Sequence, residues 1–325
     1  LFPLSPKAAG HLSDASRILS CSANAFYFTE RQKLTHALAG ITDDKRPLAM
    51  LKKLTAAQRA AYDENGYVDR IDIFTASEVE EIVAELAEAE AAFGHELDAA
   101  GRNNAHYVLP VLDRITHDPR ILDAVEDLIG PDILVVGTTL FIKEPETKGF
   151  VSWHQDARYI GLEPHNWVTG WVALGDVSME NGCMQMIPGS HKAPLREHVD
   201  TFGKDNILTR GQTVPDVDEA SAIPVEMRAG QLSLHHPRIV HGSGPNLSQR
   251  RRLGFAIQSF IAPDVDQVIG RNWTQLARGE DRYGHHGTAG HPKGVMDPDD
   301  IAFRDMTNEE LSKIFYAGAA QKGKF

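Results

Sequence analysis

The residues of this chain that are best suited to chemistry are His154 and Asp156, which lie in the segment Val151–Ile160. In an extended strand, residues i and i+2 project from the same face, so both side chains can reach one point while Gln155 points away. An imidazole and a carboxylate are two of the three ligands in a 2-His-1-carboxylate site, which binds Fe(II) and leaves coordination positions open. The pair alone also fits a strand end with two solvated polar residues.

A second segment could supply the missing ligand and an anion-binding group. His241 ends a short apolar run, and the nearby Gly242 and Gly244 allow close approach of the backbone. Arg252 then opens an apolar stretch that is typical of a buried strand. Because a buried guanidinium needs an anion, and its planar fork matches a carboxylate, Arg252 is suited to bind a dicarboxylate. A histidine followed by such an arginine is what an Fe(II)- and 2-oxoglutarate-dependent enzyme requires.

Three segments of the chain together resemble the phytanoyl-CoA dioxygenase family. They are His154–Asp156, Asn181–Lys192, and His241–Asn246 followed by Arg252. The resemblance implies a fold that is mainly β with flanking helices, a double-stranded β-helix of the cupin-like, jelly-roll kind. It also implies an oxidoreductase that uses Fe(II) as its metal and 2-oxoglutarate and O2 as cosubstrates.

The resemblance further implies roles for individual residues. The iron ligands, which form the catalytic centre, would be His154, Asp156 and His241. Arg252 would bind the distal carboxylate of 2-oxoglutarate. Trp171 and Ser243 occupy positions at which the family contacts this cosubstrate.

Two other histidines compete with His241 for the third ligand position. His235 and His236 precede Pro237 at a predicted strand end, and either could instead be a core residue beside the site. Two features favour His241 as the ligand: the Gly-Ser-Gly run that follows it, and the spacing between His241 and Arg252. The roles of the other two histidines stay open at this point.

Two further classes of function are compatible with a metal site in a jelly roll. One is a cupin-type isomerase or hydrolase that uses Zn or Mn without 2-oxoglutarate, and the other is a silent protein that only binds a ligand. Arg252 argues against the first, because only a dicarboxylate cosubstrate needs a buried guanidinium. The complete set of three ligands argues against the second.

The composition limits the partners and the compartment. The chain has 33 Lys and Arg against 45 Asp and Glu, a net charge of −12, which argues against a nucleic-acid partner. Cys21 and Cys183 are its two cysteines, so we expect no disulfide framework and a reducing compartment. There is no apolar run of membrane-spanning length and no recognisable signal peptide. We therefore expect a soluble cytoplasmic protein without a membrane partner, of undetermined oligomeric state.

The chain is expected to begin with helices and continue with strands. Residues 1–49 have no clear hydrophobic period and are predicted to be a poorly ordered extension, whereas 50–325 are predicted to form a single jelly-roll domain. The predicted helix starts are Thr55, the capping box Ser77–Glu80, Asp118–Pro119 and the capping box Thr307–Glu310.

The predicted strands are short and are separated by turn signals. They cover residues 133–136, 138–142, 167–174, 184–187, 225–227, 231–234 and 253–261. Few helices lie between them, which favours an antiparallel jelly roll over a parallel α/β sheet. The polar segment 194–222 has no periodicity and is predicted to be a loop or lid over the site.

The predicted reaction is hydroxylation of an unactivated C–H bond of a small polar metabolite, with release of succinate and CO2. An acyl-CoA would call for a basic surface, whereas this chain is acidic and its arginine cluster is committed to the cosubstrate. An acyl-CoA or secondary-metabolite hydroxylase of the same family is the alternative. The residues expected to line the substrate pocket are His106, Arg158, Tyr159, Asp281, Arg282 and Tyr283. Aromatic rings beside charges of both signs suit a zwitterion or a quaternary amine.

Overall fold

The structure, a computed structural model, describes residues 51–320. The prediction for 1–49 lies outside these residues. The helices of the described region are α2 (Ala56–Asn65), α3 (Ala76–Phe93), α4 (Pro110–Thr116), α5 (Pro119–Ile129) and α6 (Pro298–Phe315). Within 51–320, no helix is both long and apolar enough to cross a membrane.

Side-chain caps set the starts of these helices. In α2, Thr55 and Gln58 form a reciprocal capping box. The long helix α3 begins two residues earlier than predicted, because Thr75 and Glu78 form its capping box instead of Ser77 and Glu80. Thr75 is the residue that still has an extended backbone, with φ −72° and ψ 164°, so it is the one able to cap the first turn.

The C-terminal helix is longer than expected. The sequence pattern around Thr307 predicts a helix start, but α6 begins after Asp297, which caps it, with Pro298 at its first position. Thr307 lies in mid-helix, where its buried hydroxyl donates a hydrogen bond to the carbonyl oxygen of Arg304. The Thr-x-x-Glu pattern at Thr307 therefore lies inside a helix, at a buried residue, and does not cap a helix.

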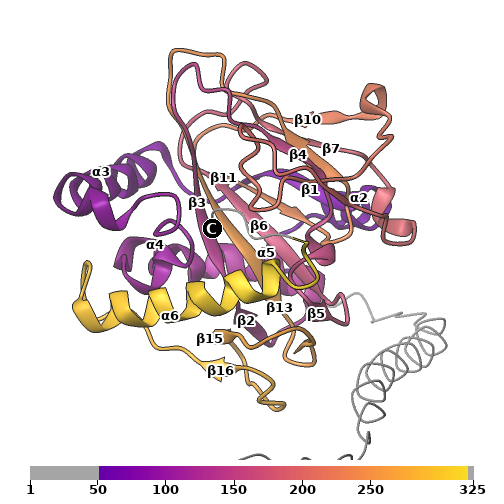
Figure 1. The fold of residues 1–325 in the computed structure, drawn as a ribbon. Coiled ribbons are helices and arrows are strands. Elements are labelled where there is room, and N and C mark those ends of the chain that lie inside the picture. The colour runs from indigo at the N-terminus through magenta and orange to yellow at the C-terminus, as the bar shows by residue number, and fades with distance from the viewer. Residues whose placement is uncertain (1–50, 321–325) are drawn as a thin grey trace, which may run out of the picture. The chain divides into compact units, whose positions relative to one another are not determined.

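Two antiparallel sheets form the centre of the molecule (Figure 1). The large sheet has the order β1 (Tyr67–Asp72), β11 (Gln231–His235), β6 (Trp167–Ala173), β13 (Arg252–Ile261), β2 (Ile133–Val135), β15 (Trp273–Arg278) and β16 (Gly287–Thr288), and β3 (Thr138–Lys143) also pairs with β13. The small sheet has the order β10 (Ile223–Val225), β7 (Met184–Met186), β12 (His241–Ser243) and β4 (Val151–His154). The exception to antiparallel pairing is β15 with β16.

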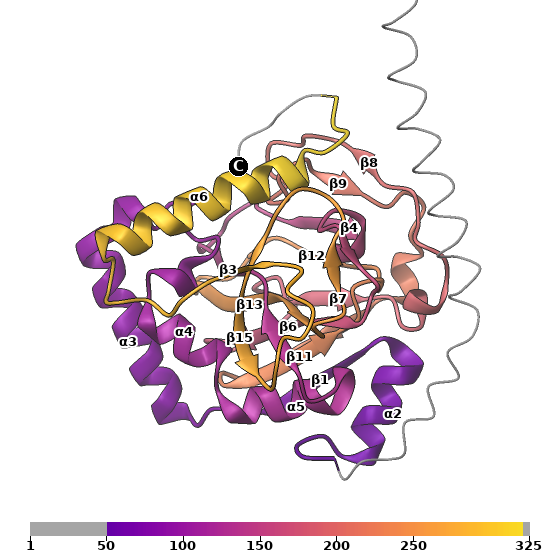
Figure 2. The ribbon, with the colours of Figure 1, turned by 90° about the horizontal axis from the view of Figure 1, so that it is seen from below.

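The two sheets face each other across one apolar cluster. Trp171 and Ala256 of the large sheet pack in it with Met184, Met186 and Val225 of the small sheet. The other face of the large sheet is covered by helices, and Figure 2 shows α3, α4 and α5 along that side, away from β4, β7 and β12. This arrangement confirms the predicted jelly roll with helical flanks.

The predicted loop over the site contains two short paired strands. Residues 194–222 include β8 (Val199–Asp200) and β9 (Gln212–Thr213), which pair with each other, and a 3-10 turn, Glu219–Ser221. The segment between β8 and β9 is held to the small sheet through a bridge between Phe150 and Asn206. It therefore has a fixed place next to strand β4.

Candidate active site

The end of strand β4 and the start of strand β12 bring the predicted ligands together. These strands are antiparallel neighbours, and His154 lies directly opposite His241. Strand β4 ends at His154, and Asp156 is the first residue of a 3-10 turn, Asp156–Arg158. The two side chains thus meet at one point as expected, although a turn after the strand, not strand alternation, positions the carboxylate.

The three side chains point their free ligand atoms at one another. Asp156 Oδ1 lies 3.4 Å from His154 Nε2 and 3.9 Å from His241 Nε2. His154 Nδ1 lies 2.9 Å from the carbonyl oxygen of Ser152, and His241 Nδ1 lies 3.3 Å from that of Ile239. Each Nδ1 therefore carries the proton and donates it, which leaves both Nε2 lone pairs directed at Oδ1.

Burial and mutual charge set the protonation states that a metal needs. Burial would raise the pKa of Asp156, but His241, His154 and His235 around it outweigh burial and hold that pKa well below its usual range. Burial, followed by the neighbouring His154, lowers the pKa of His241 well below its usual value. An ionised carboxylate and a neutral imidazole are the forms that bind a metal ion.

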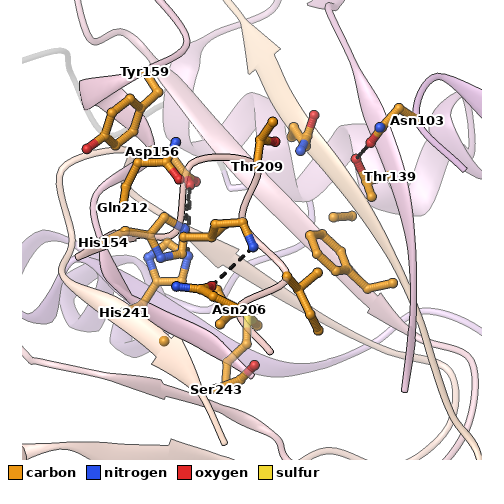
Figure 3. A pocket seen from close by; sticks show the side chains of 18 of the residues that line it. Asn103, Thr139, His154, Asp156, Tyr159, Asn206, Thr209, Gln212, His241 and Ser243 are labelled. Carbon is orange, nitrogen blue, oxygen red and sulfur yellow. Dashed lines mark hydrogen bonds and ion pairs between the residues drawn. The ribbon is translucent and has the colours of Figure 1, made fainter. Parts of the chain in front are cut away.

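A cavity of about 710 Å³ opens from these three residues (Figure 3). Figure 3 shows His154, Asp156 and His241 on one side of it and Asn103 and Thr139 on the other. The loop between β8 and β9 contributes to the wall with Phe202, Gly203, Lys204, Asn206, Ile207, Leu208 and Thr209. The predicted lid segment is therefore part of the cavity.

Arg252 lies buried in the same cavity wall without an acidic partner. It is 3% exposed, its Nε has no hydrogen-bond partner, and its Nη1 donates to the carbonyl oxygen of Gly182. The guanidinium lies 5.4 Å above the centre of the Trp171 ring. The ring fits there because residue 254 is a glycine. A Cβ atom at that position would collide with the Trp171 ring. Within residues 51–320, no carboxylate pairs with this charge.

A second buried basic residue lies beside Arg252. Lys143 is directly opposite Arg252 in the sheet and is 1% exposed. Its Nζ donates hydrogen bonds to Ser243 Oγ, at 2.7 Å, and to the carbonyl oxygen of Gly244. Burial and then the charge of Arg252 lower the pKa of Lys143 to about 6. The buried guanidinium of Arg252, which has no carboxylate partner, makes this end of the cavity an anion site.

Comparison with known proteins identifies the family. The sequence model of the phytanoyl-CoA dioxygenase (PhyH) family matches residues 62–254. This chain belongs to the phytanoyl-CoA dioxygenase family. A relative, "Phytanoyl-CoA dioxygenase domain-containing protein 1" of Rattus norvegicus, is 35% identical over 173 residues, which are 51% of this chain and 58% of that protein. The chain thus spans little more than half the length of this relative.

Two solved structures share the fold and much of the length. A "non-heme monooxygenase", ThoJ in its apo form, is 32% identical, covers 80% of this chain and 98% of its own, and has a TM-score of 0.71. The epimerase SnoN, solved with Fe3+ and alpha ketoglutarate, is 26% identical, covers 65% of this chain and 84% of its own, and has a TM-score of 0.53. The second structure contains both an iron ion and the 2-oxo acid.

The residues of this phytanoyl-CoA dioxygenase homologue fit those two groups. His154, His241 and Asp156 present two imidazole nitrogens and one carboxylate oxygen that lie within 4.8 Å of one another, as a facial iron site needs. The unpaired guanidinium of Arg252 fits the distal carboxylate of 2-oxoglutarate. Trp171 and Ser243 line the cavity next to it, as the resemblance implied.

The predicted substrate-lining residues are mostly placed elsewhere. Tyr159 lines the cavity, but Arg158 is exposed and does not. His106 is fully buried in a short 3-10 helix, Ala105–Tyr107, where its Nδ1 lies 2.8 Å from Thr138 Oγ1. Burial lowers the pKa of His106 to about 3, so it is a neutral core residue. The expectation for Arg158 and His106 was therefore wrong.

The C-terminal loop does not close over the cavity either. Asp281 accepts hydrogen bonds from the backbone of its own turn, Arg282 pairs with Asp132 at 3.3 Å, and Tyr283 is 59% exposed. This loop follows β15 at the far edge of the large sheet, so Asp281, Arg282 and Tyr283 do not line the cavity. The sequence could not show which edge of the sheet receives the loop.

Several residues in and beside the cavity were not predicted from the sequence. Lys143 supports Ser243, and Thr169 donates a hydrogen bond to Asp156 Oδ2 at 2.7 Å. His235, whose role was open, lines the cavity 3.4 Å from the same oxygen. His236 follows the last residue of β11 and does not line the cavity, and its ring centre is 5.2 Å from that of His191. Adjacent residues of an extended chain point to opposite sides, and this signal could have separated the two histidines.

Proposed function

We propose that this chain is an Fe(II)- and 2-oxoglutarate-dependent dioxygenase that hydroxylates an unactivated C–H bond of a small organic molecule. The observation that carries the proposal is a ligand set of two histidines and one aspartate that shares one cavity with a buried, unpaired arginine. A metal enzyme that does not use 2-oxoglutarate would have no use for Arg252 in that place, and the guanidinium would only cost desolvation.

Each part of the cavity has a task in this reaction. Iron and 2-oxoglutarate, when bound, supply the activation of O2 and the oxidation of the substrate. His154, Asp156 and His241 would hold the metal at the wall of the cavity. Arg252, with Ser243 and Trp171 beside it, orients the distal carboxylate. The apolar walls keep bulk water from the reacting carbon.

The cavity lining supports a substrate with an apolar body. Besides Asp156, none of its described lining residues is acidic, whereas Arg102 and Lys204 bring positive charge. The apolar lining residues include Phe141, Ile142, Phe202, Ile207 and Phe315. A volume of about 710 Å³ also exceeds what a very small metabolite would fill. We therefore propose a neutral or anionic metabolite that is partly apolar.

This substrate class replaces the expected small polar metabolite. A zwitterion or quaternary amine would gain from an anion beside its cationic group, and Asp281, which was expected to provide one, does not line the cavity. An acyl-CoA remains the alternative, since its acyl chain suits the apolar wall and its phosphates suit Arg102 and Lys204. The positive charges of Arg102 and Lys204 disfavour a cationic substrate.

Binding and turnover can be tested separately. Anaerobic addition of Fe(II) and 2-oxoglutarate to the metal-free protein should give the weak visible charge-transfer band of the chelate. Succinate release is then compared for partly apolar carboxylic acids, acyl-CoA thioesters and quaternary amines. We expect turnover with the acids. Tight Zn binding with no band would contradict the proposed reaction, and coupled turnover with quaternary amines alone would contradict the substrate class.

A further inference from the structure

His235 is a buried histidine for which the ligand set leaves no place. Its side chain is 2% exposed and lines the cavity, yet neither ring nitrogen has a hydrogen-bond partner among the described residues. Its Nε2 lies 3.4 Å from Asp156 Oδ2, slightly beyond an ordinary hydrogen bond. Burying an imidazole without a hydrogen-bond partner costs free energy, so the position of His235 beside the Asp156 carboxylate needs an explanation.

Strand pairing places a second side chain on the same oxygen. In the large sheet, His235 of β11 lies directly opposite Thr169 of β6, so both side chains project from the same face. Thr169 Oγ1 donates a hydrogen bond to Asp156 Oδ2 at 2.7 Å. One cross-strand pair therefore approaches Oδ2 from two neighbouring strands.

The two oxygens of Asp156 have different surroundings. Oδ1 faces the Nε2 atoms of His154 and His241, at 3.4 and 3.9 Å, where the metal would bind. Oδ2 faces Thr169 and His235 instead. A carboxylate whose outer oxygen is held by donors binds a metal through the other oxygen alone. A carboxylate that is free to rotate can offer both.

We propose that His235, together with Thr169, holds the outer oxygen of Asp156 and so keeps this carboxylate a one-oxygen ligand. His235 is a positioning residue: it donates Nε2–H to Oδ2 and does not bind the metal. The coordination positions opposite the three ligands then stay open for 2-oxoglutarate and O2. The inference rests on the proposed iron-dependent function.

The neighbouring histidine provides a matched control. His236 has the same side chain but follows the last residue of β11, and its Nδ1 accepts a hydrogen bond from the backbone N–H of Arg238 at 3.1 Å. It does not line the cavity. A change at His236 therefore tests for general effects of altering this strand.

The experiment compares four metal-free proteins under anaerobic conditions: the unchanged chain, His235→Met, His235→Gln and His236→Gln. Methionine fills the space without a donor, and glutamine keeps an N–H near the position of Nε2. Each protein is titrated with Fe(II), then with 2-oxoglutarate while the charge-transfer band is recorded. Thermal unfolding without metal reports on the fold.

We expect His235→Met to weaken Fe(II) binding about tenfold or more and to alter the band, with most of both effects restored in His235→Gln. His236→Gln should match the unchanged chain. Equal Fe(II) affinity and equal bands in the unchanged chain and His235→Met would overturn the role of His235. The same follows if both His235 variants lose affinity equally along with thermal stability. An unchanged chain that gives no band would instead overturn the proposed function, and this inference with it.

Discussion

Two groups of two histidines and one aspartate lie in the described part of the chain, and only one of them is arranged for chemistry. Each group has three potential ligand atoms within 4.8 Å of one another. One is His154, Asp156 and His241. The other is Asp113 and His117 of the α4 region with His291, which precedes α6. By residue type the two groups are the same.

In the second group, the aspartate oxygens are already used as hydrogen-bond acceptors. Asp113 Oδ2 accepts a hydrogen bond from His291 Nδ1 at 2.9 Å, and its Oδ1 accepts one from Gln275 Nε2 at 2.9 Å. His117 Nδ1 lies 2.9 Å from the carbonyl oxygen of Asp113. The carboxylate therefore ties α4 to the segment before α6 and to β15.

The contrast shows that orientation, not composition, makes a metal site. In the first group each Nδ1 atom faces the carbonyl oxygen two residues earlier, so both Nε2 atoms and Oδ1 converge beside a cavity. In the second group, each oxygen of the aspartate already accepts a hydrogen bond. The predictions that follow test this contrast between a site and a structural tie.

The largest expected difference lies between the two aspartates. Asp156→Ala should abolish iron-dependent turnover and weaken Fe(II) binding by more than about 100-fold, because losing a ligand costs more than losing its support. Asp113→Ala should leave Fe(II) binding unchanged and lower the free energy of unfolding by about 1–3 kcal/mol, since Gln275 and His291 lose their acceptor. Metal titration and chemical denaturation of both variants measure the difference. Loss of iron binding in Asp113→Ala would break the comparison.

The next effect concerns two adjacent arginines. Arg252→Ala should weaken 2-oxoglutarate binding by about two to three decades while iron binding stays nearly intact, because a buried charge-assisted pair is worth about 2–5 kcal/mol. Arg251 is the control: it is partly exposed and pairs with Glu90 and Glu144. Arg251→Ala should change that affinity less than about threefold. If Arg251→Ala weakened 2-oxoglutarate binding more than Arg252→Ala did, the assignment of the anion site to Arg252 would be wrong.

A smaller effect is expected at Lys143, which reaches the cosubstrate site only through Ser243. Lys143→Met removes the hydrogen bond to Ser243 Oγ and should weaken 2-oxoglutarate binding about tenfold. Thermal stability should not fall, because an apolar side chain replaces a buried amine. Titration of the charge-transfer band and thermal unfolding test both statements. A loss as large as that of Arg252→Ala would make Lys143 a direct ligand of the carboxylate.

The smallest effect separates a histidine of the core from those of the site. The pKa of His106 is about 3 in the folded chain because of burial, against 6.5 ordinarily. Between these values the unfolded chain binds a proton that the folded chain does not, so stability falls as the pH drops below about 6.5. From about pH 8 to about pH 6 this group should cost about 1 kcal/mol. His106→Gln should reduce the pH slope of denaturation without changing iron affinity, and an unchanged slope would contradict its assignment.

The parts of the site that could be predicted from the sequence are local. His154 and Asp156 are neighbours in sequence, and Arg252 stands out as a charge at the head of an apolar strand. The helix starts at Thr55 and at Asp118–Pro119 are local as well, and both were confirmed. Short-range geometry is encoded within a few residues, so such patterns predict it directly.

The parts that failed depend on long-range pairing. His106 and Asp281 were assigned to the substrate from their residue types, but strand order decides that one faces the core and the other an outer edge. Thr169 and His235 meet Asp156 because β6 and β11 are neighbours, which no spacing in the sequence reveals. A jelly roll builds its site from strands that are distant along the chain, so the residues that support the ligands are the hardest to predict.

The unpaired guanidinium of Arg252 also has a consequence for the end of each reaction cycle. Oxidative loss of CO2 shortens 2-oxoglutarate at the end that faces the metal and leaves its distal carboxylate unchanged. In the proposed reaction, Arg252 would hold succinate through the same contact that holds the incoming cosubstrate. Because the Arg252 side chain is 3% exposed, water competes poorly for this contact. Accumulated succinate would therefore compete with 2-oxoglutarate for the same site.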